Sequence, residues 1–176
     1  MTRFSRAATV AAALFAMTSP ALAHVELVND KAPADSSYKA VLMVGHGCAG
    51  SPTTELRVQI PEGLILVKPM PKPGWKIAIT MQKLAHPIDM EGHQISETVR
   101  EIEWSGGSLP DNFYDEFVFV GRLPNKPGSV LYLPTVQRCA KGVNRWIDIP
   151  AAGQNAEDLK GPAPSLTLGP KAAGGE

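Results

Sequence analysis

Apolar and polar residues alternate with a period of two in short runs throughout this chain, and this pattern constrains its fold more than any other feature. Leu56, Val58 and Ile60, for example, alternate with Arg57 and Gln59. Successive side chains of a strand point to opposite faces, so such runs are typical of strands with one buried face. The pattern predicts about nine strands, at 24–28, 38–44, 56–60, 63–67, 75–81, 97–104, 115–123, 129–133 and 145–149.

Turn-forming residues separate these runs, and no long helical period is visible. Residues 105–107 and 126–128 are predicted turns. Many short strands with frequent turns predict an all-β fold, namely a single-domain antiparallel β-sandwich of immunoglobulin-like or cupredoxin-like type, with a closed barrel as the alternative. The stretch from Pro69 to Gly74 holds three prolines in six residues and predicts a stiff connection across one end of the sandwich.

The first 23 residues have the three parts of a secretory signal peptide. Arg3 and Arg6 supply positive charge, residues 7–17 are almost wholly apolar, and Ala21-Leu22-Ala23 is a small-x-small cleavage site. Cleavage there makes His24 the first residue of an exported protein, periplasmic or secreted. The apolar run is short for a membrane span and no later segment is long enough, so we expect no integral membrane segment after cleavage.

The mature chain has the size and charge of a single small domain. Removal of 23 of the 176 residues leaves 153, with 15 basic against 17 acidic side chains. This balance lacks the concentrated positive charge that binding to nucleic acid requires. The strand pattern fades after Ala151, and residues 161–176 are rich in Pro, Gly and Ala. We therefore expect a domain at 24–160 and a disordered tail at 161–176.

Cys48 and Cys139 are the only two cysteines. In an exported chain, a single pair of cysteines predicts a disulfide. The alternative is a thiolate metal site, but the two residues lack the paired CxxC spacing that is typical of such sites. A disulfide between them closes a loop of about 90 residues, which the chain-entropy model credits with roughly 4 to 5 kcal/mol.

An N-terminal histidine is a ready metal ligand. After cleavage, the α-amine and the ring Nδ1 of His24 can chelate one ion, and both nitrogens lose their protons near neutral pH. Copper(II) suits this pair best, because it leads the divalent affinity series and favours nitrogen and oxygen donors. The alternative is that His24 follows the cleavage site by chance.

Spacing alone does not select the remaining ligands of such a site. The candidates are Glu26, His46, His86, His93, Asp115, Glu116 and the indole of Trp146. We expect the acidic residues at 111–116 to form a solvated rim, and His86 and His93 to be exposed beside a hairpin turn. For His46 we expect packing beside the disulfide, with metal ligation as the alternative.

Several short motifs occur in a characteristic order. They are His24-Val25-Glu26, Ser51-Pro52-Thr53-Thr54, Ile60-Pro61-Glu62-Gly63, Lys72-Pro73-Gly74-Trp75, Trp104-Ser105-Gly106-Gly107, Tyr114-Asp115-Glu116-Phe117 and Arg145-Trp146. Together they resemble the YcnI-like family of copper-binding proteins, over nearly the whole mature chain to about residue 164. Two departures are notable: some members end in a transmembrane anchor that this chain lacks, and the cysteine pair is not universal.

The resemblance implies a β-sandwich that binds one copper(II) ion per chain through a single-histidine brace. The amine and imidazole of His24 match the brace, Glu116 matches the carboxylate with Asp115 in reserve, and Trp146 matches the nearby tryptophan. It also implies a role in copper transport, delivery or homeostasis at the cell envelope. The expected partners are an envelope copper importer or a copper chaperone.

Other classes of function remain open. A GxSxG elbow, an HExxH motif and a glycine-rich phosphate loop are all absent from the sequence, and we expect no enzymatic activity. A copper-dependent oxidase or monooxygenase is one alternative, because such enzymes also use an N-terminal histidine brace. A metal-free module that binds another envelope protein is the other.

Overall fold

The structure is a computed structural model that describes residues 24–90 and 92–172. The predicted signal peptide and the last four residues lie outside this part of the chain. The strands are β1 (Glu26–Leu27), β2 (Lys31–Pro33), β3 (Ser37–Val44), β4 (Thr53–Gln59), β5 (Ile65–Pro69), β6 (Lys76–Met90), β7 (His93–Leu109), β8 (Asp115–Arg122), β9 (Val130–Tyr132), β10 (Thr135–Cys139), β11 (Val143–Trp146) and β12 (Ser165–Gly169). A short 3-10 helix, η1, spans Ala156–Asp158.

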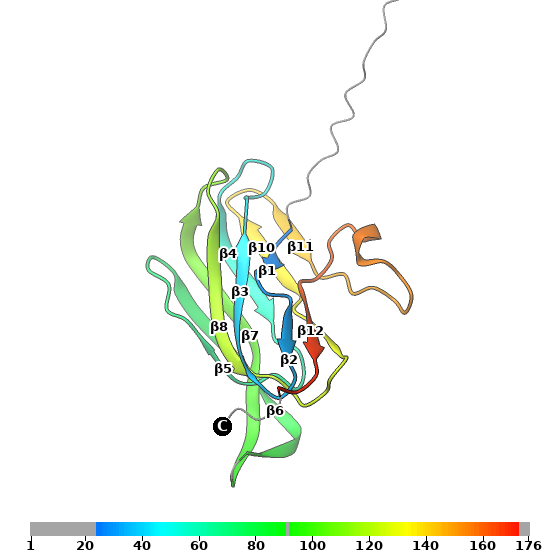
Figure 1. The fold of residues 1–176 in the computed structure, drawn as a ribbon. Coiled ribbons are helices and arrows are strands. Elements are labelled where there is room, and N and C mark those ends of the chain that lie inside the picture. Colours follow the sequence, from blue (N-terminus) through cyan, green and yellow to red (C-terminus); the bar gives the residue numbers. More distant parts are fainter. Residues whose placement is uncertain (1–23, 91, 173–176) are drawn as a thin grey trace, which may run out of the picture.

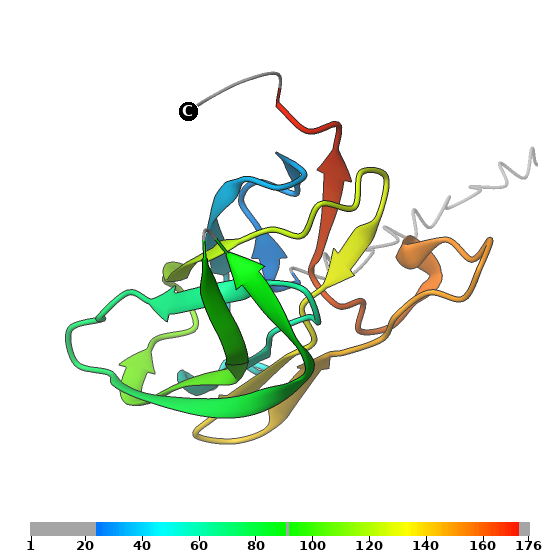
Figure 2. The same cartoon turned by 90° about the horizontal axis from the view of Figure 1, so that it is seen from below.

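The strands form two packed sheets and a third, smaller one (Figures 1 and 2). The four-stranded sheet has the order β1-β3-β8-β5, and the five-stranded sheet has the order β11-β10-β4-β7-β6. The third sheet has the order β2-β12-β9 and contains a parallel pair, β2 with β12. The predicted all-β sandwich is therefore confirmed, with the parallel pair as an addition to the antiparallel scheme.

Large apolar side chains from both main sheets fill the space between them. Trp104 of β7 and Phe117 of β8 are fully buried, and their rings meet edge to face with centroids 5.6 Å apart. Trp75 contacts the same phenylalanine from the connection between β5 and β6, at 4.9 Å. This connection passes from one main sheet to the other, as the prolines at 69–74 predicted.

The predicted turn at residues 105–107 is wrong, because β7 continues through them to Leu109. Gly106 has a positive φ of 79°, a conformation that glycine adopts without strain. A Cβ on Gly107 would lie 2.1 Å from the ring of Trp75. These glycines therefore let a strand bend and let an indole lie against its backbone.

The predicted disordered tail at 161–176 is also wrong where the structure describes it. Residues Ser165–Gly169 form β12, and Leu166 and Leu168 belong to the hydrophobic core with 1% exposure each. The domain thus extends beyond residue 160 to at least Gly169. The strand was missed because its alternation covers only five residues within a stretch rich in Pro, Gly and Ala.

The hairpin formed by β6 and β7 projects beyond one end of the sandwich (Figure 1). His86 and His93 are exposed on it, as predicted. In the described residues, no helix is long and apolar enough to cross a membrane.

Candidate metal centre

His24 and Trp146 meet where the edges of the two main sheets come together. His24 lies two residues before Glu26, the first residue of β1, which is an edge strand of the four-stranded sheet. Trp146 ends β11, an edge strand of the five-stranded sheet. Their ring centroids are 5.0 Å apart with an interplanar angle of 66°. The fold therefore brings together two of the predicted site residues that are more than 100 positions apart in the sequence.

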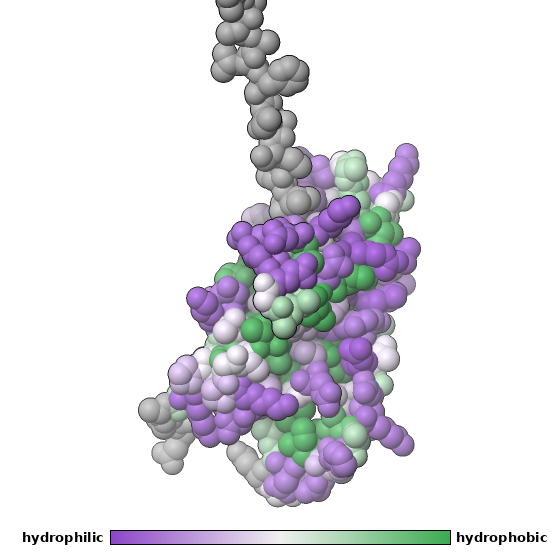
Figure 3. Space-filling view, turned by 90° about the vertical axis from the view of Figure 1, so that its right-hand side faces the viewer, coloured by the Kyte–Doolittle hydropathy of each residue, from purple (hydrophilic) through white to green (hydrophobic). Residues whose placement is uncertain are grey.

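The imidazole of His24 is buried on one side only. Its Nε2 is inaccessible to solvent and has no hydrogen-bond partner, whereas the residue as a whole is half-buried. A shallow hollow beside the residue is lined by Glu26, Asp30 and residues 162–165. Figure 3 shows the side of the molecule that carries β11 and β12, where hydrophilic residues predominate around smaller hydrophobic areas.

The indole nitrogen of Trp146 is already used in a hydrogen bond. Trp146 is 6% exposed, and its Nε1–H donates to Oε1 of Gln137 at 3.2 Å. An indole nitrogen is a donor only and has no lone pair in the ring plane to offer. Trp146 can therefore face a metal ion with its ring but cannot bind one through nitrogen.

Gln137 of β10 links Trp146 to the loop that follows β3. Its side chain is 1% exposed, and Nε2 donates to the carbonyl oxygen of His46 at 2.6 Å and to Oγ1 of Thr53 at 2.8 Å. Nδ2 of Asn144 also donates to Gln137 Oε1, at 3.2 Å. Sequence analysis missed this residue. The available signal was its position two residues before Cys139, on the same inward face of a strand.

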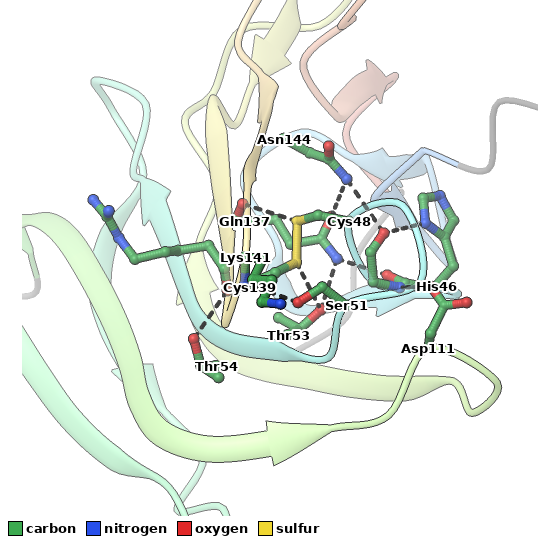
Figure 4. The surroundings of a disulfide bond; sticks show 12 residues. His46, Cys48, Ser51, Thr53, Thr54, Asp111, Gln137, Cys139, Lys141 and Asn144 are labelled. Carbon is green, nitrogen blue, oxygen red and sulfur yellow. Dashed lines mark hydrogen bonds between the residues drawn. A yellow bond between two sulfur atoms is a disulfide. The ribbon is translucent and has the colours of Figure 1, made fainter.

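The predicted disulfide is confirmed. Cys48 and Cys139 are bonded, with their Cα atoms 5.9 Å apart, and they are 91 positions apart in the sequence. Figure 4 shows the bond among the polar side chains that surround it. Next to it, Oδ1 of Asp111 accepts a hydrogen bond from the backbone nitrogen of Gly47 at 3.0 Å. The disulfide and these hydrogen bonds fix the loop at residues 45–48.

Glu116 lies on the outward face of the four-stranded sheet. The register pairs Glu116 of β8 with Met43 of β3, and Met43 with Glu26 of β1. Strands are spaced about 4.8 Å apart, so the backbones of Glu26 and Glu116 lie about 10 Å apart in this row. Among the described residues, no hydrogen bond or ring contact joins Glu116 to His24.

Asp115, the reserve for Glu116, is engaged elsewhere. Its carboxylate forms an ion pair with Nζ of Lys72 at 2.7 Å and accepts the backbone N–H of Glu116 at 2.8 Å. Lys72 also donates to the backbone oxygen of Glu116, at 3.0 Å. The carboxylate of Asp115 is therefore already paired with a lysine, whereas the carboxylate of Glu116 is exposed.

A conventional side-chain metal cluster is absent from the described ranges. In residues 24–90 and 92–172, no three His, Cys, Asp or Glu side chains come close enough together to hold a metal ion. A metal site at His24 would therefore depend on donors of another kind, such as a free main-chain amine. The half-buried imidazole with an unpartnered Nε2, packed on an aromatic ring, fits one end of such a site.

Comparison with protein families gives a match that starts at His24. The profile of a family described as "Domain of unknown function (DUF1775)" matches residues 24–168. This chain belongs to the DUF1775 family. The family includes the YcnI-like copper-binding domains, so the resemblance drawn from the motifs is confirmed.

The DUF1775 match ends inside β12, which agrees with the strand's place in the core. Among solved structures, the domain is similar to a crystal structure of an uncharacterized protein from Nocardia farcinica, which is described as having an immunoglobulin-like fold. The TM-score is 0.61, with 20% identity over 83% of this chain and 98% of that one. No curated protein matches significantly. The DUF1775 domain is thus an immunoglobulin-like sandwich.

Proposed function

We propose that this DUF1775 domain is a periplasmic copper(II)-binding protein that carries, stores or delivers copper. One ion per chain is held by the α-amine and Nδ1 of His24, with Glu116 as the carboxylate ligand and Trp146 as an aromatic wall. The observation that carries this proposal is the contact between His24 and Trp146 at 5.0 Å. The start of the family match at residue 24, the first residue after the predicted cleavage site, supports it.

The two ring nitrogens of His24 would have different roles in the brace, with Nδ1 bound to copper and Nε2 packed against protein. The brace uses Nδ1, which leaves the proton on Nε2. Nε2 is the atom that is buried against protein, without a hydrogen-bond partner. An N–H group that points at the face of an aromatic ring gains a weak attraction, and the edge-on packing of His24 on Trp146 is compatible with one. The ring would thus be held from its Nε2 side.

Trp146 would shield the ion without bonding it through nitrogen. Its Nε1–H is engaged by Gln137, and its ring is what it presents to His24. A low-polarity wall strengthens the attraction between copper(II) and a carboxylate, because less water competes for both. The carboxylate also offsets part of the ion's charge.

Glu116 is the carboxylate that the family resemblance assigns, and Glu26 is its nearest competitor in this structure. Both lie on the outward face, with Met43 between them in the row. Single variants Glu116→Gln and Glu26→Gln keep side-chain size while they remove the charge. We expect Glu116→Gln to weaken copper(II) binding, whereas Glu26→Gln and Asp115→Asn should leave it nearly unchanged.

We propose a carrier rather than an enzyme, located in the periplasm or secreted. A carrier must pass its copper to another protein, so an envelope copper importer or copper chaperone is the proposed partner. Incubation of the copper-loaded protein with reductant, oxidant and polysaccharides tests the enzymatic alternative. Oxidised products that depend on substrate would contradict the carrier assignment.

The brace is tested with two forms of the protein that differ by one residue at the N-terminus. One form begins at His24, and the other carries an extra glycine before it. The extension turns the chelating amine into an amide. Loss of an outer-shell partner alone typically weakens metal binding about 10–100-fold, so we expect a larger loss here, measured by competition with a copper(II) chelator.

The controls separate the brace from other modes of binding. The His24→Ala variant should bind as weakly as the extended form, and the glycine extension should not weaken it further. Copper(II) affinity that survives the extension would remove the brace. A ligand that binds only the native state must stabilise it. A melting temperature that does not move with excess copper would therefore favour the metal-free interaction module.

A further inference from the structure

The outward face of the four-stranded sheet carries apolar residues that do not belong to the core. Phe117 and Phe119 of β8 point into the core, so Val118 between them points outward. Val118 lies opposite Val41 of β3, and the two are 5% and 8% exposed. In the described part of the chain, the hydrophobic core cluster includes neither valine. Neighbours on the same face therefore shield them from solvent.

Strand pairing extends this patch across the whole sheet. The backbone nitrogen of Val28 donates to the oxygen of Val41 at 2.9 Å, and that of Met70 donates to the oxygen of Val118 at 2.8 Å. Val28 is 51% exposed and Met70 is 49% exposed. These four residues form a central row that crosses all four strands. A contiguous apolar patch surrounded by polar residues is typical of an interaction surface.

Charges of opposite sign flank the central row. On one side lies an acidic row, which consists of Glu26, Met43 and Glu116. On the other side lies a lysine row, which consists of Lys39, Val120 and Lys68. The four charged side chains are exposed, and none of them forms an ion pair within the described residues.

This arrangement of charges is complementary to itself. A two-fold axis along the central row brings a second copy face to face with the first, and sets the acidic row of each copy opposite the lysine row of the other. Because β8 lies between β3 and β5, Glu116 then faces Lys39 and Lys68 of the second copy. Packed sheets lie about 10 Å apart, a gap that a glutamate and a lysine side chain span together.

We propose that two copies of this domain associate through the outward face of the four-stranded sheet. The inference goes beyond the proposed function and needs no copper. With the usual strand spacings, four strands and three rows cover roughly 19 by 20 Å, or about 400 Å² per copy. A stable interface buries about 800 Å² per partner. The dimer is therefore weak and reversible, with a dissociation constant between about 10 μM and 1 mM.

Sedimentation equilibrium of the unaltered mature protein tests the proposal directly. The protein is kept free of metal with a chelator, so the result does not depend on the proposed copper site. We expect the average mass to rise from that of a monomer toward that of a dimer as the concentration approaches about 1 mM. A protein that stays monomeric over this range overturns the proposal, whatever other partner the face might bind.

The Met70→Lys variant, with Met81→Lys as the matched control, identifies the face. Met70 lies on the proposed axis and faces its own counterpart, so the substitution sets two positive charges against each other. We expect the dimer to be at least about 10-fold weaker. Met81 is equally exposed, at 52%, but lies on β6 of the other main sheet, so Met81→Lys should have no effect. Equal effects of the two substitutions would contradict the proposed face.

An exchange of charges tests the pairing of the acidic row with the lysine row. The Glu116→Lys variant and the Lys39→Glu/Lys68→Glu variant each place like charges opposite each other, so each should be monomeric on its own. In an equimolar mixture every facing pair is again of opposite charge, and the mixture should dimerise about as tightly as the unaltered protein. Melting temperatures show whether each variant is folded. Folded variants that do not associate when mixed would show that the copies do not pair in this way.

Discussion

Gln137 is the single residue on which the geometry of the candidate site most depends. Its buried amide contacts four groups from three segments: Trp146 and Asn144 of β11, Thr53 of β4, and the carbonyl of His46 in the loop after β3. Buried polar networks stabilise one arrangement when each member has a partner, and they become costly when one is removed. The hydrogen bond to Gln137 therefore helps to set the orientation of the Trp146 ring toward His24.

The Gln137→Leu variant should lose both stability and copper affinity. Each buried donor or acceptor left without a partner costs about 1–3 kcal/mol, and the variant removes the acceptor of the Trp146 Nε1–H group. We expect urea denaturation to show a loss of at least this size. Copper(II) affinity should fall about 10–100-fold, the usual effect of losing an outer-shell partner.

The Thr135→Val variant is the control for this change. Thr135 lies on the same strand and is equally buried, but its hydroxyl donates only to the nearby carbonyl of Leu133, at 2.8 Å. Its loss should reduce stability without altering copper affinity. If Gln137→Leu folds and binds copper as tightly as the unaltered protein, the network does not position the site.

Tyr38 gives a prediction about pH. Its hydroxyl donates to the backbone oxygen of Asn29 at 2.5 Å, and burial, assisted by the negative charge of Asp30, raises its pKa from 10.0 to about 12. The folded state thus binds this proton more tightly than the unfolded state does. The resulting stabilisation is fully present below pH 10 and is lost as pH rises from about 10 to about 12.

Denaturant unfolding at pH 9 and at pH 11 measures this effect. We expect the unaltered protein to lose more stability between these two values than the Tyr38→Phe variant, which has no proton to lose at this position. Absorbance titration should show one of the three tyrosines ionising late. Equal pH slopes for the two proteins would show that Tyr38 does not contribute.

At the scale of elements, strands with a strict alternation of apolar and polar residues could be predicted from sequence, and the others could not. β10 escaped prediction because its inward face is polar or sulfur-containing at Thr135, Gln137 and Cys139, so no apolar alternation marks it. β12 escaped because it is short and lies among breakers of regular structure. The alternation of apolar and polar residues indicates which face of a strand is buried, but it does not indicate which hydrogen bonds form inside the core.

The candidate site shows the same division. His24, Glu116 and Trp146 were predicted from a cleavage site and from ordered motifs, both of which are visible in the sequence. The packing of His24 on Trp146 is now visible in the structure, whereas the role of Glu116 stays a prediction. Gln137 could not be predicted, because its partners come from segments separated by up to 91 positions, and only strand pairing brings them together.

The contribution of β12 is testable with neighbouring residues on opposite faces. Leu168 is 1% exposed in the core, whereas Thr167 faces solvent. Replacement of a buried leucine by alanine typically costs about 2–5 kcal/mol. We expect a loss in this range for Leu168→Ala and almost none for Thr167→Ala, measured by denaturant unfolding. Equal and small losses would indicate that the strand does not pack on the sandwich in solution.

At the scale of the whole molecule, the sandwich places one edge strand of each main sheet, β1 and β11, beside each other at the end where the disulfide also lies. β1 is only two residues long, and it holds His24 through two backbone pairs with β3. An N-terminal chelate needs a chain start that is fixed yet accessible, and a short edge strand provides both. The disulfide then joins the loop after β3 to the end of β10, directly beside this region.

The disulfide should stabilise the whole domain and not only its own loop. It spans 91 positions, for which the chain-entropy model gives roughly 4 to 5 kcal/mol. Domains of this kind are stable by about 5–15 kcal/mol in total, so a Cys48→Ser/Cys139→Ser double variant should fold only marginally.

Urea unfolding of the apo protein, with and without a thiol reductant, measures the loss. The reductant should reproduce the effect of the double variant in the unaltered protein and change nothing in the variant. Because the bond anchors the 45–48 loop, which Gln137 joins to Trp146, we also expect weaker copper(II) binding by the double variant under conditions where it is folded. A stability within about 1 kcal/mol of the unaltered protein would show that the core alone holds these strands together and that the bond is dispensable.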